Sequence, residues 1–274
     1  MRLAVTGASG RLGRHLVQAA LAEGHQVVSL DLAGQEPVDI RRDDLAPWLD
    51  GCDAVIHSAA LHGRHLDLGL SRQAFIDTNV SGTLRLLEAA KAAGVGRFLY
   101  TSTTSIYGAA MDCPDRAVWV DEDLAPRPRD IYDISKQAAE HLCRDFFAPG
   151  FTTAVLRVSR FMDEPANAMA NYRLYRGLDE RDGALAHLKA LSAPLAGFEI
   201  FNISNRSPFQ QADLGELKRD AAAVVLRYYP DAKALYRQRG WQLPASIDRV
   251  YVTAKAERLL GYRPKFNFDQ LLGL

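Results

Sequence analysis

The sequence is poor in cysteine, has no excess of either charge and contains no long apolar run. Its three cysteines, Cys52, Cys113 and Cys143, are far apart in the chain and form no CxxC pair. An odd, sparse set of this kind argues against a disulfide framework and against a zinc site. It is typical of proteins in a reducing compartment, so we expect a cytoplasmic protein whose cysteines are structural.

The charge balance narrows the possible partners. Lysine and arginine together number 33, the same as aspartate and glutamate, and basic residues do not cluster with aromatic ones. Because nucleic-acid binders carry such a cluster, we expect no nucleic-acid partner. No segment reaches the length of a membrane span and the first residues lack the pattern of a secretory leader, so we expect no membrane partner. His62 and His65 lack a third ligand at a suitable spacing, so no metal site is expected. A polar small molecule is the expected partner.

Short apolar segments alternate with longer amphipathic ones along the first 160 residues. The short segments predict strands at residues 3–5, 26–30, 53–57, 97–100 and 153–158. The amphipathic segments predict helices at residues 12–23 and 71–93 and around Tyr132. Strands and helices in this order are joined by right-handed crossovers into one parallel sheet, so we predict an α/β fold with a doubly wound parallel sheet.

The regular alternation ends near Val158, and prolines punctuate the shorter segments that follow. We therefore expect residues 1–160 to form a dinucleotide-binding domain, which a returning strand at about 197–206 completes. Residues 161–196 and 207–274 are expected to form a small substrate-binding cap. Such a cap would lie over the carboxyl ends of the strands, where sheets of this type bind ligands.

A glycine-rich turn follows the first predicted strand and opens the first helix. Gly7 and Gly10 permit a tight turn and close approach to a pyrophosphate, and Gly13 lets the helix pack on the strand. Asp31 ends the second strand, about twenty residues further on, where a carboxylate accepts hydrogen bonds from the adenine ribose. That carboxylate repels a 2′-phosphate and favours NAD over NADP, although Arg11 could tolerate the phosphorylated cofactor.

Tyr132 and Lys136 stand four residues apart on one predicted helix, so their side chains share a face. The lysine charge is expected to lower the pKa of the phenol towards neutrality. A phenol tuned in this way can exchange a proton with an alcohol or a carbonyl. The pair is a weak signal by itself and gains its meaning from the nucleotide turn.

From residue 3 to about 160 the sequence resembles the extended short-chain dehydrogenase/reductases of the epimerase/dehydratase branch. The likeness lies in residues 6–13 (TGASGRLG), 39–40 (DI), 57–60 (HSAA), 79–90 (NVSGTLRLLEAA), 101–108 (TSTTSIYG) and 128–136 (PRDIYDISK). The resemblance implies a binding site for NAD. Its expected residues are Gly7, Ser9, Gly10, Arg11, Leu12, Gly13, Asp31, Asp39, Ile40, Ser58, Ala59, Ala60, Asn79, Tyr132 and Lys136.

The same resemblance implies the catalytic roles. Tyr132 would be the acid/base, and Lys136 would hold the nicotinamide ribose. Thr103 would hydrogen-bond the reacting oxygen of the substrate, flanked by Ser102 and Thr104 as further substrate contacts. Asn79 would support this network as a structural or relay residue. Asp133 stands where the family prefers a small residue, and we expect it to face solvent.

The family contains several reactions. Its dehydratases usually carry Asp-Glu directly after the catalytic threonine, whereas this chain has Thr104 and Ser105, so dehydration is not expected. Arg160 stands where nucleotide-sugar enzymes commonly have asparagine, and the chain is shorter than is usual for their epimerases. Both features favour a smaller substrate than a nucleotide sugar.

Part of the predicted cap points to an anionic substrate. Residues 163–165 (DEP) and 171–173 (NYR) are similar to a segment of the uronate dehydrogenases. The likeness implies that Arg173 binds a sugar carboxylate, with Arg160 as a second candidate and Arg176 as a competitor for both. Residues 103–105 differ from those of the uronate dehydrogenases, so substrate identity does not transfer.

We predict an NAD-dependent oxidoreductase that transfers a hydride between the cofactor and a secondary alcohol or lactol of a sugar or similar polar molecule. One alternative is a nucleotide-sugar epimerase that retains NAD, and a remote one is a non-catalytic dinucleotide sensor that regulates a partner. The resemblance also implies a homodimer formed through helices near residues 80–94 and 132–147.

Overall fold

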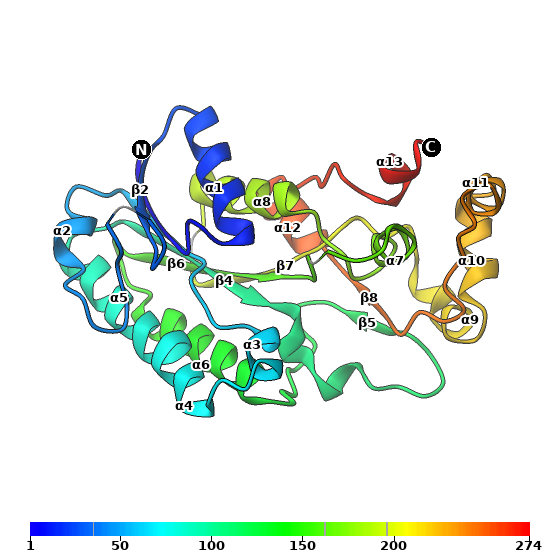
Figure 1. Ribbon diagram of the computed structural model, residues 1–274, viewed down its shortest axis with the longest axis horizontal. Coiled ribbons are helices and arrows are strands. Elements are labelled where there is room, and N and C mark those ends of the chain that lie inside the picture. Colours follow the sequence, from blue (N-terminus) through cyan, green and yellow to red (C-terminus); the bar gives the residue numbers. More distant parts are fainter. Residues whose placement is uncertain (35, 162, 196) are drawn as a thin grey trace.

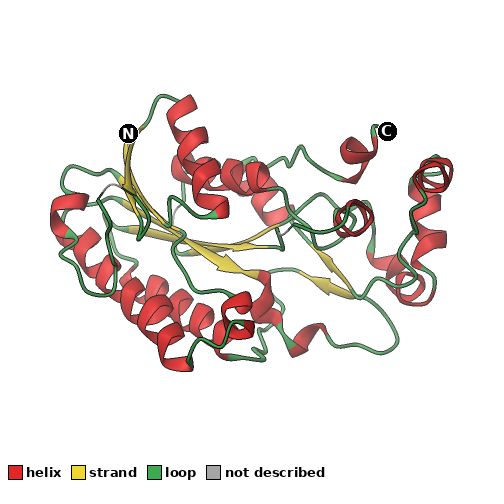
Figure 2. Cartoon of the chain, in the orientation of Figure 1, coloured by secondary structure: helices red, strands yellow, loops and turns green. Residues whose placement is uncertain are grey.

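The computed structural model describes residues 1–34, 36–161, 163–195 and 197–274. A parallel six-stranded sheet lies at its centre (Figures 1 and 2). In spatial order its strands are β2 (Gln26–Leu30), β1 (Arg2–Thr6), β3 (Ala54–His57), β4 (Arg97–Thr103), β6 (Thr152–Val158) and β7 (Glu199–Ile203). All neighbouring strands run parallel. The predicted α/β fold with a doubly wound sheet is confirmed.

Helices cover both faces of this sheet, which explains why its inner strands are apolar along their whole length. One face packs against α1 (Arg11–Ala22), α8 (Glu180–Ser192) and α12 (Ala254–Leu260). The other face packs against α5 (Gly82–Ala92) and α6 (Ile131–Phe146), with α2 (Ala46–Leu49) beside α5 (Figure 1). None of the helices in the described ranges is long and apolar enough to cross a membrane.

The helix predicted at residues 71–93 is divided into three parts. It contains α4 (Arg72–Phe75), the π-helical η1 (Ile76–Ser81) and then α5. The wider π-helical turn carries the buried Asn79, whose amide bonds the backbone of Leu61 in both directions at 2.8 Å. The buried hydrogen bonds of Asn79 thus accompany a π-helical turn within a segment whose apolar spacing predicts one continuous helix. Leu61 precedes the short α3 (Gly63–Asp67).

The remaining helices form a third apolar cluster, apart from the two clusters on the sheet. Its helices are α7 (Ala166–Tyr172), α9 (Leu214–Arg219), α10 (Ala221–Tyr228), α11 (Ala232–Arg239) and α13 (Phe268–Leu272). The short η4 (Gln211–Asp213) directly precedes α9. A two-stranded parallel sheet of β5 (Val118–Val120) and β8 (Arg249–Tyr251) adjoins this cluster. The short η2 (Thr104–Tyr107) and η3 (Ala109–Met111) lead from β4 towards β5.

Two segments assigned to the cap lie elsewhere, because α12, within residues 207–274, packs on the sheet and on α8, and α8 itself packs on the sheet. Residues 161–196 contain α8, whose apolar face packs on α1 and on the sheet instead of on the cap helices. The approach is close, because a Cβ on Gly183 would lie only 3.1 Å from Leu12 Cδ1. Proline punctuation marks where elements end, but it does not reveal on which layer each element packs.

The sheet reverses its strand order between β1 and β3. From β1 the chain goes outward to β2, and it then returns to add β3 on the other side of β1. Loops that leave the carboxyl ends of β1 and β3 therefore diverge, and a crevice opens between them. Doubly wound sheets bind their ligands at this point.

Candidate active site

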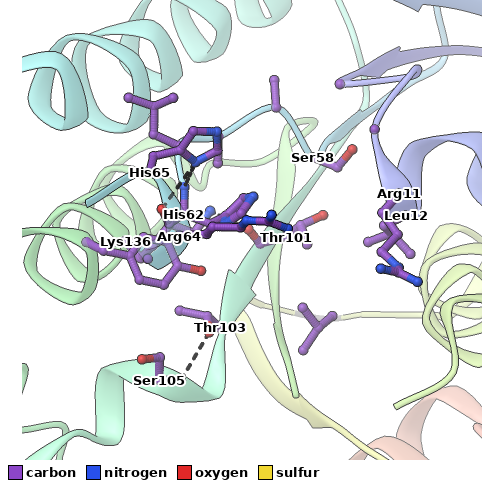
Figure 3. Close-up of a pocket in the computed structure, with 18 of the residues that line it drawn as sticks. Arg11, Leu12, Ser58, His62, Arg64, His65, Thr101, Thr103, Ser105 and Lys136 are labelled. Atoms are coloured by element: carbon purple, nitrogen blue, oxygen red, sulfur yellow. Dashed lines mark hydrogen bonds between the residues drawn. The ribbon is translucent and has the colours of Figure 1, made fainter. Parts of the chain in front are cut away.

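A cleft of about 1390 Å³ follows the carboxyl ends of the strands. Gly7 after β1, Asp31 after β2, Ser58 after β3 and Thr103 at the end of β4 all line it. Figure 3 shows Ser58, Thr103 and Lys136, which come from separate segments, around the same space. The cleft is large enough for a dinucleotide together with a small substrate.

The glycine-rich turn leaves no room for side chains. Gly7 has a φ of +67°, and a Cβ there would lie 2.7 Å from the backbone nitrogen of Ala59. A Cβ on Gly13 would lie 1.9 Å from the carbonyl oxygen of Gly7. Helix α1 therefore begins directly against the turn, with Gly10 as its N-cap. Its first amides have no partner within the helix and suit the negative charge of a pyrophosphate.

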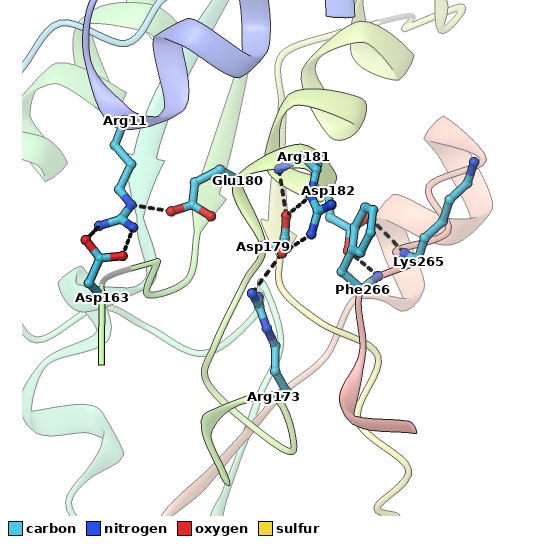
Figure 4. Close-up of polar contacts among 9 residues, drawn as sticks. All are labelled: Arg11, Asp163, Arg173, Asp179, Glu180, Arg181, Asp182, Lys265 and Phe266. Atoms are coloured by element: carbon cyan, nitrogen blue, oxygen red, sulfur yellow. Dashed lines mark hydrogen bonds and ion pairs between the residues drawn. The ribbon is translucent and has the colours of Figure 1, made fainter. Parts of the chain in front are cut away.

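Asp31 is held in place by the backbone around it. Its carboxylate accepts hydrogen bonds from Ser9 N at 2.9 Å and from Ala33 N at 3.0 Å. It lines the cleft beside the glycine-rich turn, as a ribose-binding carboxylate must. Arg11 instead forms ion pairs with Asp163 and Glu180 (Figure 4). Its guanidinium is thus engaged away from Asp31, where a 2′-phosphate would need a cation.

Two further predicted cofactor residues line the same cleft. Asp39 is buried, and Arg41 binds both of its carboxylate oxygens at 2.8 and 2.7 Å. The hydrogen bond from Arg41 is the main reason that the pKa of Asp39 is lowered. Ile40 packs beside Gly82, where a Cβ would come within 3.0 Å of it. The Asp39 carboxylate is therefore already bound by Arg41. Its contact with adenine stays a prediction.

The segment after β3 is fixed by hydrogen bonds to β1. Ser58 Oγ donates to the carbonyl oxygen of Thr6 at 2.7 Å, and Ala59 N donates to Thr6 Oγ1 at 3.2 Å. Behind them the buried His57 contacts Thr6 Oγ1 at 2.6 Å and Thr83 Oγ1 at 2.9 Å. Burial, together with the charge of Lys136, lowers the pKa of His57 to about 3. His57 is therefore a neutral structural residue.

Tyr132 and Lys136 reach the cleft from the first turns of α6, and Thr103 reaches it from β4. Burial raises the pKa of Tyr132 to about 12, and the Thr103 hydroxyl offsets part of this rise. The Lys136 ammonium donates to the Thr101 carbonyl oxygen at 2.6 Å and lies 4.2 Å from the centroid of the Tyr100 ring. Burial lowers the pKa of Lys136 to about 7.

The expected tuning of the phenol is therefore wrong in direction. We expected Lys136 to lower the pKa of Tyr132 towards neutrality, but its ammonium is directed at Thr101 and is itself poorly solvated. Spacing on a helix predicts a shared face, whereas the balance of burial and charge depends on the surrounding fold. Tyr132 is consequently a protonated phenol at neutral pH.

Two residues with predicted site roles have mainly internal partners. Asn79 Nδ2 donates to Ser135 Oγ at 2.9 Å, which ties η1 to α6 beside Lys136. Ser102 lines the cleft, but its hydroxyl donates to Glu140 at 2.5 Å. Thr104 lines the cleft and is nearly fully buried. A substrate contact of Ser102 would require its hydroxyl to leave Glu140.

Sequence reasoning missed the buried network that Glu140 joins. Arg157 donates to both Glu140 oxygens at 3.0 and 2.7 Å and to Tyr107 Oη at 3.0 Å. Tyr107 in turn donates to Asn202 Oδ1 at 2.7 Å. This network links α6 to β6 and β7 beneath the site. Its one sequence signal is an acid four residues after Lys136, on the same helical face.

Arg173 does not line the main cleft, contrary to its predicted role as the substrate clamp. It is only 3% exposed, donates to Asp179 at 3.0 Å (Figure 4), and has its pKa lowered by burial. Arg160 and Arg176 do line the cleft, and their guanidinium carbons lie 5.6 and 5.1 Å from the centroid of the Tyr172 ring. The NYR segment ends α7, and the helix turns its arginine inward.

The sequence did not predict several other residues that line the cleft. Arg129 and Arg249 line it from segments that are far apart in the chain. Asp133, expected to face solvent, is only 2% exposed, and its carboxylate accepts a hydrogen bond from Arg129 N at 3.2 Å. Helix α6, which carries Asp133, packs against η2.

Residues 3–162 match the model of the NAD dependent epimerase/dehydratase family. GDP-6-deoxy-D-mannose reductase from Pseudomonas aeruginosa is 31% identical, over 99% of this chain and 94% of that protein. The solved structure of RMD from Pseudomonas aeruginosa, complexed with NADPH, is 28% identical with a TM-score of 0.68, covering 99% of this chain and 96% of that one.

A second solved structure shares the fold. UDP-glucuronic acid 4-epimerase from Bacillus cereus, in complex with UDP-glucuronic acid and NAD, is 23% identical with a TM-score of 0.72, covering 100% of this chain and 97% of that one. The matches cover the nucleotide turn and the tyrosine-lysine pair, which lie in one cleft. The chain therefore belongs to the NAD-dependent epimerase/dehydratase family, and the protein is an NAD(P)-dependent enzyme of the extended short-chain dehydrogenase/reductase type.

Proposed function

We propose that the protein transfers a hydride between NAD and a secondary alcohol or lactol of a sugar that carries a carboxylate or a phosphate. The nicotinamide supplies or accepts the hydride when the cofactor is bound. Tyr132 exchanges a proton with the reacting oxygen, and Thr103 donates a hydrogen bond to the same oxygen. Lys136 holds the ribose, while Asp31 and the amides at the start of α1 hold the adenosine and pyrophosphate portions.

The protonation of Tyr132 sets the pH dependence. Because burial raises its pKa to about 12, the phenol carries its proton at neutral pH and can donate it to a carbonyl oxygen. In the opposite direction the phenol must first lose that proton. We therefore expect the rate of alcohol oxidation to rise from pH 7 to pH 10, and the rate of carbonyl reduction to show no such rise.

Arg176 carries the inference of an anionic substrate. Its side chain lines the cleft and contacts the Tyr172 ring, and it makes no ion pair with any carboxylate in the described part of the chain. Arg160, which also lies near that ring, is paired with Glu164. The charge of Arg176 also acts on Asp248, but a guanidinium that forms no ion pair in a ligand cleft is suited to bidentate binding of a carboxylate or a phosphate.

The test compares two buried or half-buried arginines from neighbouring turns. Arg176→Met and Arg173→Met would be assayed with uronic acids, sugar phosphates, nucleotide sugars and neutral aldoses, by the absorbance of NADH. Loss of a hydrogen-bonded charge pair costs about 1.5–3 kcal/mol, so we expect Arg176→Met to raise KM for the anionic substrate by about 10- to 100-fold with little change in kcat. Arg173→Met should leave that KM unchanged. An unaltered KM in Arg176→Met would exclude the clamp.

A nucleotide-sugar epimerase that retains NAD is the second candidate. It would use Tyr132 and Thr103 for an oxidation and its reversal. The ion pairs of Arg11 with Asp163 and Glu180 support this candidate, since they join the start of α1 to segments beyond β6 and would slow cofactor exchange. Stoichiometric NADH formation with substrate identifies the dehydrogenase, and turnover of a nucleotide sugar without NADH identifies the epimerase.

We further propose a homodimer formed through α5 and α6. Ile134, on the outer face of α6, is 50% exposed, and an apolar side chain there suits a helical interface. Light scattering at several concentrations tests the proposal, and a mass of one chain throughout would exclude it. A cytoplasmic location is proposed on the ground that Cys52, Cys113 and Cys143 are free thiols.

A further inference from the structure

The carboxylate of Asp133 has an environment that helix capping does not explain. The N-cap of α6 is Asp130, whose Oδ1 accepts a hydrogen bond from Asp133 N at 3.0 Å. The side chain of Asp133 folds back, and its Oδ2 accepts from Arg129 N at 3.2 Å. Its Oδ1 is buried and has no hydrogen-bond partner in the described residues. Asp133 thus holds a half-satisfied carboxylate directly beside Tyr132.

Stability alone does not favour this arrangement. An acid in the first turn of a helix interacts favourably with the helix dipole while it remains in water. Burial of a carboxylate oxygen without a donor is unfavourable, and burial accordingly raises the pKa of Asp133. An exposed rotamer or a small residue would avoid that cost. The observed position therefore points to a role in the neighbouring site.

The surroundings of Asp133 connect the segment that carries Tyr132 with the segment that carries Thr103. The Ser105 side chain approaches the carboxylate and lowers its pKa. Ser105 N donates to Thr103 Oγ1 at 3.1 Å, so the same residue contacts Thr103 (Figure 3). Asp133 follows Tyr132 on α6, and Ser105 follows Thr103 by two residues in η2. Helix α6 packs against η2, so Asp133 and Ser105 lie where the segments that carry Tyr132 and Thr103 meet.

We propose that Asp133 is a positioning residue that fixes Tyr132 relative to Thr103 and whose negative charge acts on the phenol. The proposal rests on the proposed function in one respect, namely that Tyr132 is the group that exchanges the proton. The charge of Asp133 is effective because the side chain is almost completely removed from water, which would otherwise screen it.

Other titratable and charged groups line the cleft with the phenol. Those on the same helix and its cap are Asp130 and Lys136, and those on other segments are His62, Arg64, His65 and Arg129. The buried Tyr100 on β4 also interacts with the phenol. Lys136 is directed at Thr101, and the charges of Asp133 and Asp130 both raise the pKa of Tyr132. Asp130 is exposed, so solvent screens it. Asp133 is the buried member of this acidic pair.

Two substitutions separate the effect of the Asp133 charge from the effect of its side chain on the position of Tyr132. Asp133→Asn keeps the size and an acceptor for Arg129 N but removes the charge, whereas Asp133→Ala removes both. The phenol can be titrated without any substrate, by NMR of protein with ¹³Cζ-labelled tyrosine in saturating NAD. The resonance that is missing from Tyr132→Phe identifies Tyr132. Asp130→Asn is the matched control, because it removes an exposed acid from the same helix end.

We expect Asp133→Asn to lower the measured pKa of Tyr132 by about one unit, and Asp130→Asn to lower it by clearly less. In the direction of carbonyl reduction, Asp133→Asn should keep kcat within about threefold, whereas Asp133→Ala should lower it about tenfold or more through misplacement of the phenol. Thermal unfolding would confirm that both variants are folded. A titration curve of Asp133→Asn that coincides with the parent curve would overturn the action of the charge. A normal kcat in Asp133→Ala would overturn the positioning role.

The titration separates this proposal from the function itself. If Tyr132→Phe retains turnover, the proposed function fails, whatever the NMR titration shows. If Tyr132→Phe is inactive and the Asp133 variants behave as the parent, the function stands and the role of Asp133 fails.

Discussion

The sharpest test of the cofactor site is the substitution Gly13→Ala. The new Cβ would lie 1.9 Å from the carbonyl oxygen of Gly7 and 2.8 Å from Ala8 Cα. Both atoms belong to the backbone, so no side chain can move aside, and α1 must shift away from the turn. Overpacking of this kind costs about 1–3 kcal/mol, against a gain of about 1 kcal/mol from replacing a helical glycine by alanine.

A matched control lies on α9. A Cβ on Gly215 would meet nothing closer than the flexible end of Arg219, at 3.4 Å. Gly215→Ala should therefore raise the free energy of unfolding by about 0.5–1 kcal/mol and leave cofactor binding unchanged. Gly13→Ala should lower the free energy of unfolding by up to about 2 kcal/mol and weaken NADH binding by more than tenfold, because the amides that face the pyrophosphate move.

Urea unfolding measures the first quantity, and titration of NADH fluorescence measures the second. Both variants would be compared with the parent protein in the same buffer. If Gly13→Ala bound NADH as tightly as the parent and unfolded at the same urea concentration, the close packing of turn, strand and helix described above would be incorrect.

Three further outcomes follow from the site. Tyr132→Phe should abolish turnover while NADH binding is retained, and activity near that of the parent would exclude the phenol as the acid/base. Lys136 has its pKa lowered to about 7, so the unfolded chain takes up its proton more readily between pH 7 and pH 10, and stability rises with pH in that window. Lys136→Met should therefore increase the free energy of unfolding by a few kcal/mol at pH 6 and by less at pH 9. An equal change at both pH values in urea unfolding would contradict the conclusion that burial lowers the pKa of Lys136. Asp31→Ala should reduce the preference for NADH over NADPH in competitive fluorescence titrations, and an unchanged ratio of the two dissociation constants would remove Asp31 from the ribose site.

The features that the sequence predicts well are those encoded locally. A short apolar strand, three glycines at fixed spacing and a helix start lie together in residues 2–13, and the structure has them as predicted. The assignments that failed depend on distant parts of the chain. Arg173 is buried because α7 and the segment leading to α8 enclose it, and nothing near Arg173 in the sequence reports this.

The protonation states of the site residues could not be predicted from the sequence either. Tyr132 and Lys136 do share a helix, but the sign of the pKa shift is decided by burial and by the Thr101 carbonyl oxygen from another element. The same is true of Asp133, since an acid in the first turn of a helix reads as a solvated residue until η2 is placed against it.

The Glu140–Arg157 ion pair has a consequence for any mutational scan of this enzyme. Both side chains are about 5% exposed, so replacement of either one alone leaves a buried charge without its partner. Single-residue scans will therefore score both positions as intolerant, although Arg157 is absent from the cleft and Glu140 reaches it only through Ser102. A simultaneous replacement by two apolar residues of similar volume should be tolerated far better than either single change. Intolerance at these two positions would then report the packing of α6 against β6. It would not identify catalytic residues.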